Sequence, residues 1–381
     1  MTAQLSFYVH IPYCVKRCGY CDFNTYTPSE LREGGTLEMV SNDYIDAVLK
    51  EIEIARVSAP GVVPTIFFGG GTPSLLPAND LGRVITAIKS GWSVSPDCEI
   101  TLEANPDSVD ASKLMAFREA GFNRVSFGMQ SAQPHVLATL DRTHNPENVL
   151  RAIEGARAAG FSSVSVDLIY GTPGESLDDW RSTVESALAL GVDHISAYAL
   201  IVESGTKLAN QIKRGELSMP DDDLMADMYL LVDRLAQESG LSWYELSNWS
   251  KPGHESQHNI AYWKNSNWWG LGPGAHSHKD GMRWWNIKHP TAYKAALFAG
   301  TTVIAESEVL TPSQLADEAI MLPIRMREGI ALANLSPEQI SRVSPYSQSG
   351  HVDPLKWESG ILQLTPEGRL IADRIVRELV V

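Results

Sequence analysis

Residues 8–21 read YVHIPYCVKRCGYC, a β-branched run that leads directly into three closely spaced cysteines. Three residues separate Cys14 from Cys18 and two separate Cys18 from Cys21, so three thiols fall on one tight loop after a predicted strand. The fourth cysteine, Cys98, stands far from this trio, and we expect it to be a small buried residue. Four cysteines spread this thinly form no disulfide framework, and the tight trio points to metal or redox chemistry.

The overall composition is that of a globular protein. The 381 residues include 44% hydrophobic and 20% charged residues, which excludes an extensively disordered or fibrous chain. The formal net charge of −15 argues against a nucleic-acid partner. No apolar run reaches the ~18–20 residues of a membrane span, and the N-terminus lacks the features of a secretory signal. We therefore expect a cytoplasmic protein with no membrane span. Peripheral membrane contact remains open, and so does the choice between a monomer and a dimer.

Short β-branched runs alternate with helical patterns in the first half of the chain. The predicted strands are Leu5–Ile11, Thr65–Phe68, Glu99–Ala104, Arg124–Met129, Ser163–Ile169 and His194–Ala199. The predicted helices between them are Asn42–Arg56, Asp80–Ser90, Ala111–Ala120, Glu147–Ala159 and Leu177–Leu190. This alternation predicts parallel βαβ units. Six units are too few for an eightfold barrel, so an open partial barrel and a doubly wound sheet are both possible, and in both the functional groups gather at the carboxyl ends of the strands.

The pattern changes after residue 240. Seven of the ten tryptophans lie between Trp243 and Trp285, together with four histidines. These histidines are His254, His258, His276 and His278. After Thr311 we expect short helices, a hairpin and a closing helix in a small appended domain. We therefore predict two regions, 1–240 and 241–381.

The cysteine trio favours an iron–sulfur cluster. Tetrahedral zinc takes four ligands, and no fourth Cys or His stands at a suitable spacing nearby. Three thiolates on a cubane cluster leave one iron free to bind a small molecule. The alternatives are a zinc site completed by a distant histidine, or three free thiols.

Several glycines and polar residues stand at predicted strand ends. Gly69–Thr72 follows the second strand, where an exposed backbone can bind a ligand or form a plain turn. Glu103, Gln130 and Asp167 lie at or within apolar strands, and Arg142 lies in a loop. Buried polar groups of this kind need partners, which are either a polar ligand or other groups of the core.

Six further stretches, in order, resemble a known family. They are YVHIPYC at Tyr8–Cys14, FFGGGTPS at Phe67–Ser74, LEANP at Leu102–Pro106, SFGMQS at Ser126–Ser131, LDRTH at Leu140–His144 and VDLIYGTPGES at Val166–Ser176. With the CxxxCxxC loop they resemble the radical S-adenosylmethionine (SAM) superfamily, specifically the oxygen-independent coproporphyrinogen III oxidase family and, most closely, its heme-chaperone HemW branch. The resemblance extends from Tyr8 to the C-terminal helix. It implies an α/β fold, a partial (β/α)6 barrel with a smaller C-terminal α+β domain.

The resemblance also implies the cofactors and their ligands. Cys14, Cys18 and Cys21 would hold a [4Fe–4S] cluster whose open iron chelates SAM. The residues that would bind SAM are Tyr8, Tyr20, Gly70, Gly71, Thr72, Glu103, Gln130, Arg142 and Asp167.

The tryptophan-rich region suggests a site for a flat macrocycle. Aromatic side chains can wall a porphyrin and an imidazole can bind its iron, although such residues also pack as an ordinary aromatic core. The sequence HNIAYW at His258–Trp263 matches the HNxxYW pattern associated with heme binding in the HemW branch. His258 is therefore the candidate heme ligand, with His254 and His276 next.

Two departures separate the chain from the oxidases that it resembles. Those oxidases read CxxxCxxCxC, whereas Phe23 stands here at the last position. Only Met1–Ser6 precede the first strand motif, where the oxidase has a long extension. We therefore expect a chaperone that binds heme and transfers it to an acceptor protein, rather than a coproporphyrinogen III oxidase. The alternative is oxidative decarboxylation of coproporphyrinogen III to protoporphyrinogen IX.

Overall fold

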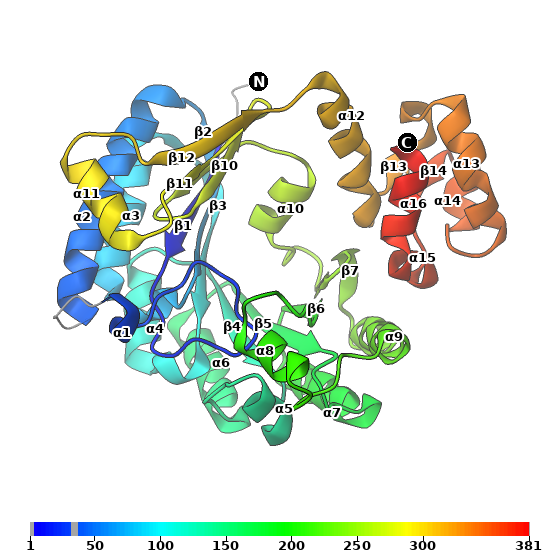
Figure 1. Ribbon diagram of the computed structural model, residues 1–381, viewed down its shortest axis with the longest axis horizontal. Helices are drawn as coiled ribbons and strands as arrows, with labels where there is room; N and C mark the ends of the chain where they lie inside the picture. Colours follow the sequence, from blue (N-terminus) through cyan, green and yellow to red (C-terminus); the bar gives the residue numbers. More distant parts are fainter. Residues whose placement is uncertain (1–3, 32–36, 381) are drawn as a thin grey trace.

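Six parallel strands form the centre of the molecule (Figure 1). The computed structural model describes residues 4–31 and 37–380. The strands lie side by side in the order of the sequence and are β1 (Ser6–Ile11), β2 (Val62–Gly70), β3 (Ser93–Ala104), β4 (Arg124–Gln130), β5 (Ser163–Tyr170) and β6 (His194–Ala199). All six predicted strands are present, and β2 and β3 are longer than predicted because each continues beyond its apolar segment.

Helices follow the strands and cover the outer face of the curved sheet (Figure 1). They are α1 (Pro28–Leu31), α2 (Leu37–Ser58), α3 (Ala78–Gly91), α4 (Ala111–Glu119), α5 (Pro134–Thr139), α6 (Pro146–Ala159), α7 (Leu177–Ala189), α8 (Lys207–Lys213) and α9 (Asp222–Glu238). Local sequence sets several of their boundaries. Helix α6, for example, begins with an Asn145 capping box and Pro146 and ends at Gly160, whose φ is +83°.

Strands that follow residue 240 extend the same sheet on both sides. The strands β12 (Ile304–Val309), β11 (Met282–Asn286), β10 (His276–Lys279) and β9 (Trp268–Leu271) lie beside β1, and β8 (Asn248–Ser250) and β7 (Ser242–Glu245) lie beside β6. The resulting 12-stranded sheet ends at β12 and β7 and does not close. This open arrangement confirms the predicted partial barrel. The division of the chain at residue 240 stays a prediction.

Strand β1 shows how the sequence directs side chains to the two faces of the sheet. Phe7, Val9 and Ile11 are fully buried, and Phe7 packs edge-on against Trp92 with ring centroids 4.8 Å apart. Because side chains alternate along a strand, Tyr8 and His10 point to the opposite, concave face. Both residues line a pocket there.

The C-terminal segment forms a second, smaller core. Helices α12 (Pro312–Met321), α13 (Pro337–Gln348), α14 (Pro354–Glu358), α15 (Pro366–Leu370) and α16 (Ala372–Leu379) accompany the strands β13 (Ile330–Ala331) and β14 (Ile361–Leu362). Its buried residues include Val343, Leu362 and Ile375. The predicted hairpin was wrong, because the two antiparallel strands β13 and β14 are not joined by a short turn. Helices α13 and α14 lie between them in the sequence.

A buried ion pair joins this segment to the larger core. Both terminal nitrogens of Arg369 donate to the carboxylate of Asp233 in α9, at 2.9 and 2.7 Å. Trp249 donates to the same carboxylate at 2.8 Å, and the guanidinium lies 4.3 Å from the ring centroid of Trp243. The two side chains of the ion pair are almost completely buried.

No helix within residues 4–31 and 37–380 is long and apolar enough to cross a membrane.

Candidate functional site

The three-cysteine loop follows β1 at the carboxyl ends of the strands. The Cys14 thiol lies 3.8 Å from the Thr72 hydroxyl, and a guanidinium nitrogen of Arg142 lies 3.4 Å from the Cys18 sulfur. Burial, together with the neighbouring Cys21 and Cys18 thiols, raises the pKa of Cys14 to about 11. The three predicted ligands therefore share one loop, with Cys14 beside Thr72 and Cys18 beside Arg142. In the described part of the chain, no three His, Cys, Asp or Glu side chains converge to hold a single metal ion.

The glycine run after β2 lies against the backbone that leads into this loop. The Gly71 and Thr72 amides donate to the carbonyls of Ile11 and Tyr13 at 2.7 and 2.8 Å. A Cβ on Gly71 would lie 2.5 Å from the Tyr13 carbonyl oxygen, and Gly70 has a φ of +108°. Side chains are therefore excluded at Gly70 and Gly71, and the backbone hydrogen bonds hold the run against the segment that leads to the cysteines.

Two carboxylates, Glu103 and Asp167, face the concave interior. Glu103 accepts a hydrogen bond from the Gly70 amide at 3.2 Å, and Asp167 accepts from the Ser126 hydroxyl at 3.0 Å. Burial raises the pKa of Glu103 to about 8, and the nearby negative charge of Asp167 contributes to this shift. Burial also raises the pKa of Asp167. Both shifts disfavour the ionised carboxylates, and a positively charged group bound beside them would lower their pKa values again.

Arg142 connects the cysteine loop to the strand ends. It donates to the Gly128 carbonyl at 2.9 Å and to the side chain of Asn105, and its Nε atom is buried without a partner among the described residues.

Two further predicted SAM ligands, Gln130 and Tyr20, lie near the strand ends. Gln130 has a left-handed φ of +61° at the end of β4. Tyr20 is partly buried beside an apolar cluster, where burial raises its pKa.

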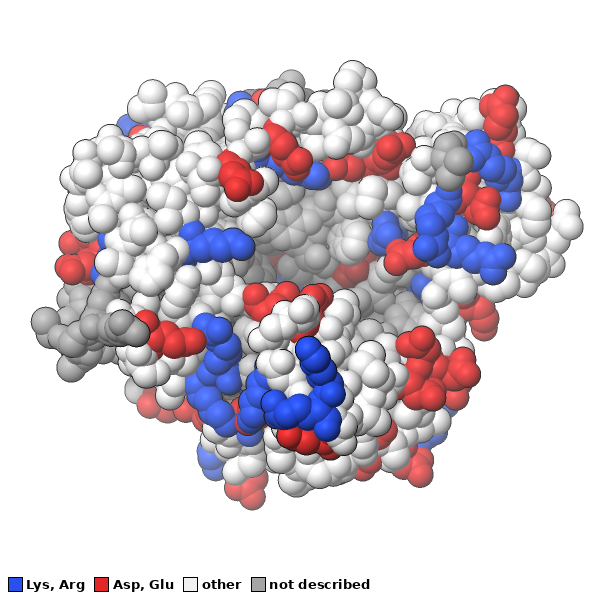
Figure 2. Space-filling view, viewed as in Figure 1, with Lys and Arg blue, Asp and Glu red and all other residues white. Residues whose placement is uncertain are grey.

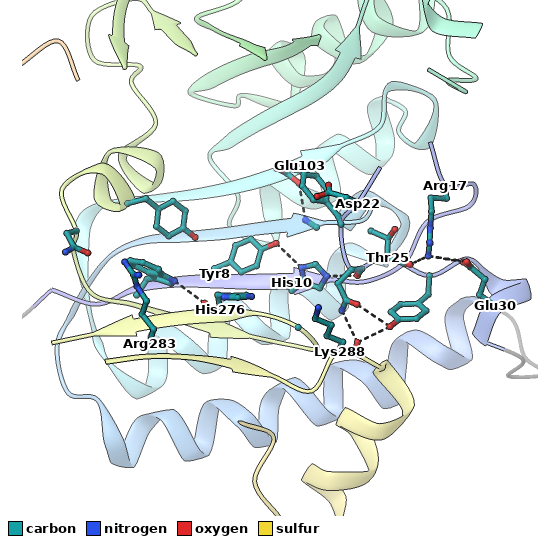
Figure 3. Close-up of a pocket in the computed structure, with 18 of the residues that line it drawn as sticks. Tyr8, His10, Arg17, Asp22, Thr25, Glu30, Glu103, His276, Arg283 and Lys288 are labelled. Atoms are coloured by element: carbon teal, nitrogen blue, oxygen red, sulfur yellow. Dashed lines mark hydrogen bonds and ion pairs between the residues drawn. The ribbon is translucent and has the colours of Figure 1, made fainter. Parts of the chain in front are cut away.

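A pocket of about 980 Å³ joins these strand ends to the tryptophan-rich region. Figure 2 shows a hollow at the centre of this face, with acidic and basic side chains around it. The wall is formed by Tyr8, His10, Arg17, Asp22, Phe23, Asn24, Thr25, Tyr26, Glu30, Gly70, Glu103, Tyr262, Asn265, Trp268, Gly274, His276, Arg283, Lys288 and Leu322. Tyr8, Gly70 and Glu103 of the predicted SAM site thus share one space with aromatic side chains from the later segment (Figure 3).

His258, the predicted heme ligand, is buried outside the wall of this pocket. Its Nδ1 lies 2.7 Å from the Thr65 hydroxyl and its Nε2 lies 2.9 Å from the Tyr262 hydroxyl. Its ring stacks on Phe67 with centroids 5.0 Å apart. Both ring nitrogens are therefore occupied, and burial lowers the pKa of His258 to about 3.

The rest of the HNxxYW pattern also makes structural contacts. These residues belong to the short helix α10 (Gln257–Trp263), whose amides at Gln257 and His258 both donate to Glu99 at 3.0 Å. Asn259 donates to Glu245 at 3.0 Å. Tyr262 is the member of the pattern that lines the pocket.

The other two candidate histidines lie in different places. His254 is 4.0 Å from Asp193 and does not line the pocket, whereas His276 does. Sequence reasoning missed His10 and Lys288, which also line it, and Asn105, which contacts Arg142. The LEANP motif contains Asn105, so a signal for that residue was available.

Comparison with known proteins identifies the family of the chain. The model of the radical SAM superfamily matches residues 8–187. A heme chaperone HemW from Mycobacterium tuberculosis is 46% identical over 98% of this chain and 94% of its own length. The chain belongs to the HemW family. Another member, from Bacillus subtilis, is 36% identical over 86% of this chain and 84% of its own.

The fold of this HemW family member matches that of a solved oxidase. Coproporphyrinogen III oxidase (HemN) from Escherichia coli, described as a radical SAM enzyme, superposes with a TM-score of 0.83. The match covers 99% of this chain and 90% of that one, at 21% identity. This likeness supports the fold, and the predicted partial barrel is confirmed.

The residues of this HemW family member fit the cofactors that the radical SAM superfamily implies. Soft thiolates on one loop suit an iron–sulfur cluster. The unpartnered Nε of Arg142 and the paired carboxylates Glu103 and Asp167 suit a ligand with both negative and positive groups. Gly70 lines the pocket, and a Cβ at Gly70 or Gly71 would meet the His10 ring or the Tyr13 carbonyl, so both positions require glycine.

Proposed function

We propose that the protein is a heme chaperone that binds heme beside a [4Fe–4S] cluster and SAM and passes the heme to an acceptor protein. The observation that carries this proposal is the pocket shared by Tyr8 and Glu103 with Tyr262 and Trp268. Its volume of about 980 Å³ is at the upper end of the range for small-molecule sites, and its aromatic wall suits a flat macrocycle. Relatives named heme chaperones, at up to 46% identity, support the proposal.

The cofactor ligands belong to the same proposal. Cys14, Cys18 and Cys21 would hold the cluster, which when bound supplies electrons and an open coordination position for SAM. The SAM site would consist of Tyr8, Tyr20, Gly70, Gly71, Thr72, Glu103, Gln130, Arg142 and Asp167. In it, the glycines admit the ligand to the backbone, the carboxylates accept its positive groups, and Arg142 holds its negative group. A location in the cytoplasm and the absence of a nucleic-acid partner stay predictions.

Oxidation of coproporphyrinogen III is the alternative function. Phe23 lines the pocket at the position of the additional oxidase cysteine, and its side chain is 65% exposed. Because Phe23 has no thiol, it cannot replace this cysteine, and its presence argues against coproporphyrinogen oxidation by this protein.

The experiment uses the full chain after anaerobic reconstitution with iron and sulfide. One sample receives hemin, and a second receives SAM, reductant and coproporphyrinogen III. We expect stable hemin binding and no porphyrinogen turnover. Steady formation of protoporphyrinogen by a protein that retains no hemin would reverse the choice between the two functions.

A further inference from the structure

Two histidines line the large pocket, and their ring nitrogens differ in one decisive respect. His10 has both nitrogens occupied, by the Tyr8 hydroxyl and by the Asn24 carbonyl, each at 2.9 Å. Neither ring nitrogen of His276 has a hydrogen-bond partner within residues 4–31 and 37–380. Among the imidazoles that face the pocket, His276 therefore has a lone pair available for an iron atom.

The backbone and ring of His276 are both held in place. In β10 the residue pairs with Trp285 of β11, and its carbonyl accepts a hydrogen bond from Trp268 at 3.0 Å. Its ring stacks on the Trp285 indole, with centroids 5.4 Å apart and planes at 21°. One face of the imidazole is thus supported while the residue as a whole remains exposed, and Figure 3 shows it between Arg283 and Lys288.

One basic side chain near His276 is available for an anionic group of the cargo. Arg17 and Arg283 also line the pocket, but they pair with Glu30 at 3.2 Å and Glu318 at 2.5 Å. Lys288 lines the pocket without an ion pair in the described part of the chain. Its ammonium is close enough to His276 to lower the pKa of the imidazole, in addition to the effect of burial. A propionate beside Lys288 would neutralise this charge.

Aromatic and apolar side chains complete the wall. Tyr262 and Trp268 lie edge to face, with centroids 4.8 Å apart, and both line the pocket together with Phe23 and Leu322. The hydroxyl of Tyr262 is bonded to His258, which fixes the orientation of the phenol ring. Tyr262 is the wall residue to which His258 is hydrogen-bonded in the described part of the chain, so the role of His258 is to position that ring.

We propose that His276 is the imidazole that binds the heme iron and that Lys288 pairs with a heme propionate, while His258 is a positioning residue that holds Tyr262. This inference rests on the proposed function, since it requires that the protein binds heme. It replaces His258 as the iron ligand and assigns the polar end of the cargo to β10 and the loop after β11.

The test is a hemin titration of the reconstituted full chain, followed by Soret absorbance and by electron paramagnetic resonance of the ferric heme. His276→Ala should lose the imidazole-ligated spectrum and bind hemin at least about tenfold more weakly. Added imidazole should restore that spectrum, while iron content and SAM affinity stay unchanged. His258→Gln should keep an imidazole-ligated spectrum. His254→Ala is the matched control, because His254 lies outside the pocket, and it should behave like the wild type.

A separate experiment tests the contact between Lys288 and a heme propionate. Lys288→Gln should weaken hemin binding by up to about fivefold but leave the binding of hemin dimethyl ester unchanged, because the ester has no anionic propionates. Equal effects on both ligands would remove Lys288 from the proposal.

The outcomes separate the inference from the proposed function. A wild-type protein that binds no hemin would contradict both. A wild-type protein that binds hemin, with an unchanged spectrum in His276→Ala, would overturn only the ligand assignment. Loss of the ligated spectrum in His258→Gln, with its retention in His276→Ala, would return the assignment to His258.

Discussion

The Nδ1 atom of His258 lies 2.7 Å from the hydroxyl oxygen of Thr65, so the histidine of the aromatic pattern is bonded to the second strand of the core. The Thr65 hydroxyl in turn lies 2.8 Å from that of Ser6 in β1. A chain of three hydrogen-bonding side chains therefore connects α10 to β2 and β1. Because both ends of the imidazole are occupied, His258 contributes to stability as well as to the shape of the site.

This burial predicts a pH dependence of stability. The pKa of His258 falls from an ordinary 6.5 to about 3, so between these pH values the unfolded chain binds a proton that the folded chain does not. The free energy of unfolding therefore decreases as the pH falls through this window, by about 2 kcal/mol between pH 7 and 5. Urea unfolding at pH 7 and pH 5 measures this decrease. His258→Gln should show a smaller decrease than the wild type, because other buried histidines still titrate, and an identical decrease would contradict the prediction.

The cysteine loop gives the second prediction. Cys14→Ala should remove most of the iron after anaerobic reconstitution, since two thiolates hold a cluster poorly. Cys98 is buried and its sulfur lies 3.8 Å from the Glu99 carbonyl. Cys98→Ala, the matched control, should leave the iron content nearly unchanged. Equal loss of iron from both variants would refute the assignment of the ligands.

The third prediction concerns Glu103 and Asp167. Glu103→Ala and Asp167→Ala should each weaken SAM binding by roughly 10–150-fold, because a charge-assisted hydrogen bond contributes ~1.5–3 kcal/mol. Equilibrium binding to the reconstituted protein measures the effect, and the iron content should not change. Glu147→Ala, at an exposed position in α6, serves as the control. Wild-type SAM affinity in both site variants would eliminate the site model.

The fourth prediction concerns the support of the His276 loop. Glu51 in α2 accepts hydrogen bonds from the Gly272 amide at 2.8 Å, Asn286 at 2.6 Å and Tyr293 at 2.5 Å. Burial raises the pKa of Glu51 to about 7. Glu51→Ala leaves three buried donors without this acceptor, so the free energy of unfolding should fall by at least about 3 kcal/mol.

The same variant should weaken hemin binding more than SAM binding, because Gly272 leads directly into the strand of His276. Denaturant unfolding and the two titrations provide the measurements. Glu53→Ala, at an exposed position in the same helix, is the matched control. If Glu51→Ala and Glu53→Ala were equally stable, the buried hydrogen bonds would have no structural importance.

The central strands were predictable because each βαβ unit has a local signature. The alternation in residues 6–11 and the turn residues around each helix act over short distances. Cys98 is buried, as its isolated position suggested. The glycine run and Glu103 were singled out because they stand at strand ends, which meet at one edge of a parallel sheet, and Asp167 because it interrupts an apolar strand. Their role as SAM ligands stays a prediction.

The orientation of His258 could not be predicted in the same way. It depends on the parallel pairing of β9 with β1, which brings α10 against β2 across a long stretch of sequence. The hairpin of β10 and β11 was missed although Asp280-Gly281 is a strong turn signal, and both residues have positive φ, at 51° and 79°. His276 and Lys288 meet only because that hairpin extends the sheet.

The ion pair between Asp233 and Arg369 limits how this protein can be divided for experiments. A shortened chain that ends before α15 would leave the buried carboxylate of Asp233 without its cation, and uncompensated buried charges destabilise proteins by about 3–5 kcal/mol. Insolubility of such a fragment would therefore say nothing about the independence of the barrel. A cleaner dissection removes the C-terminal segment and replaces Asp233 with Asn in the same step, which keeps an acceptor for the Trp249 indole.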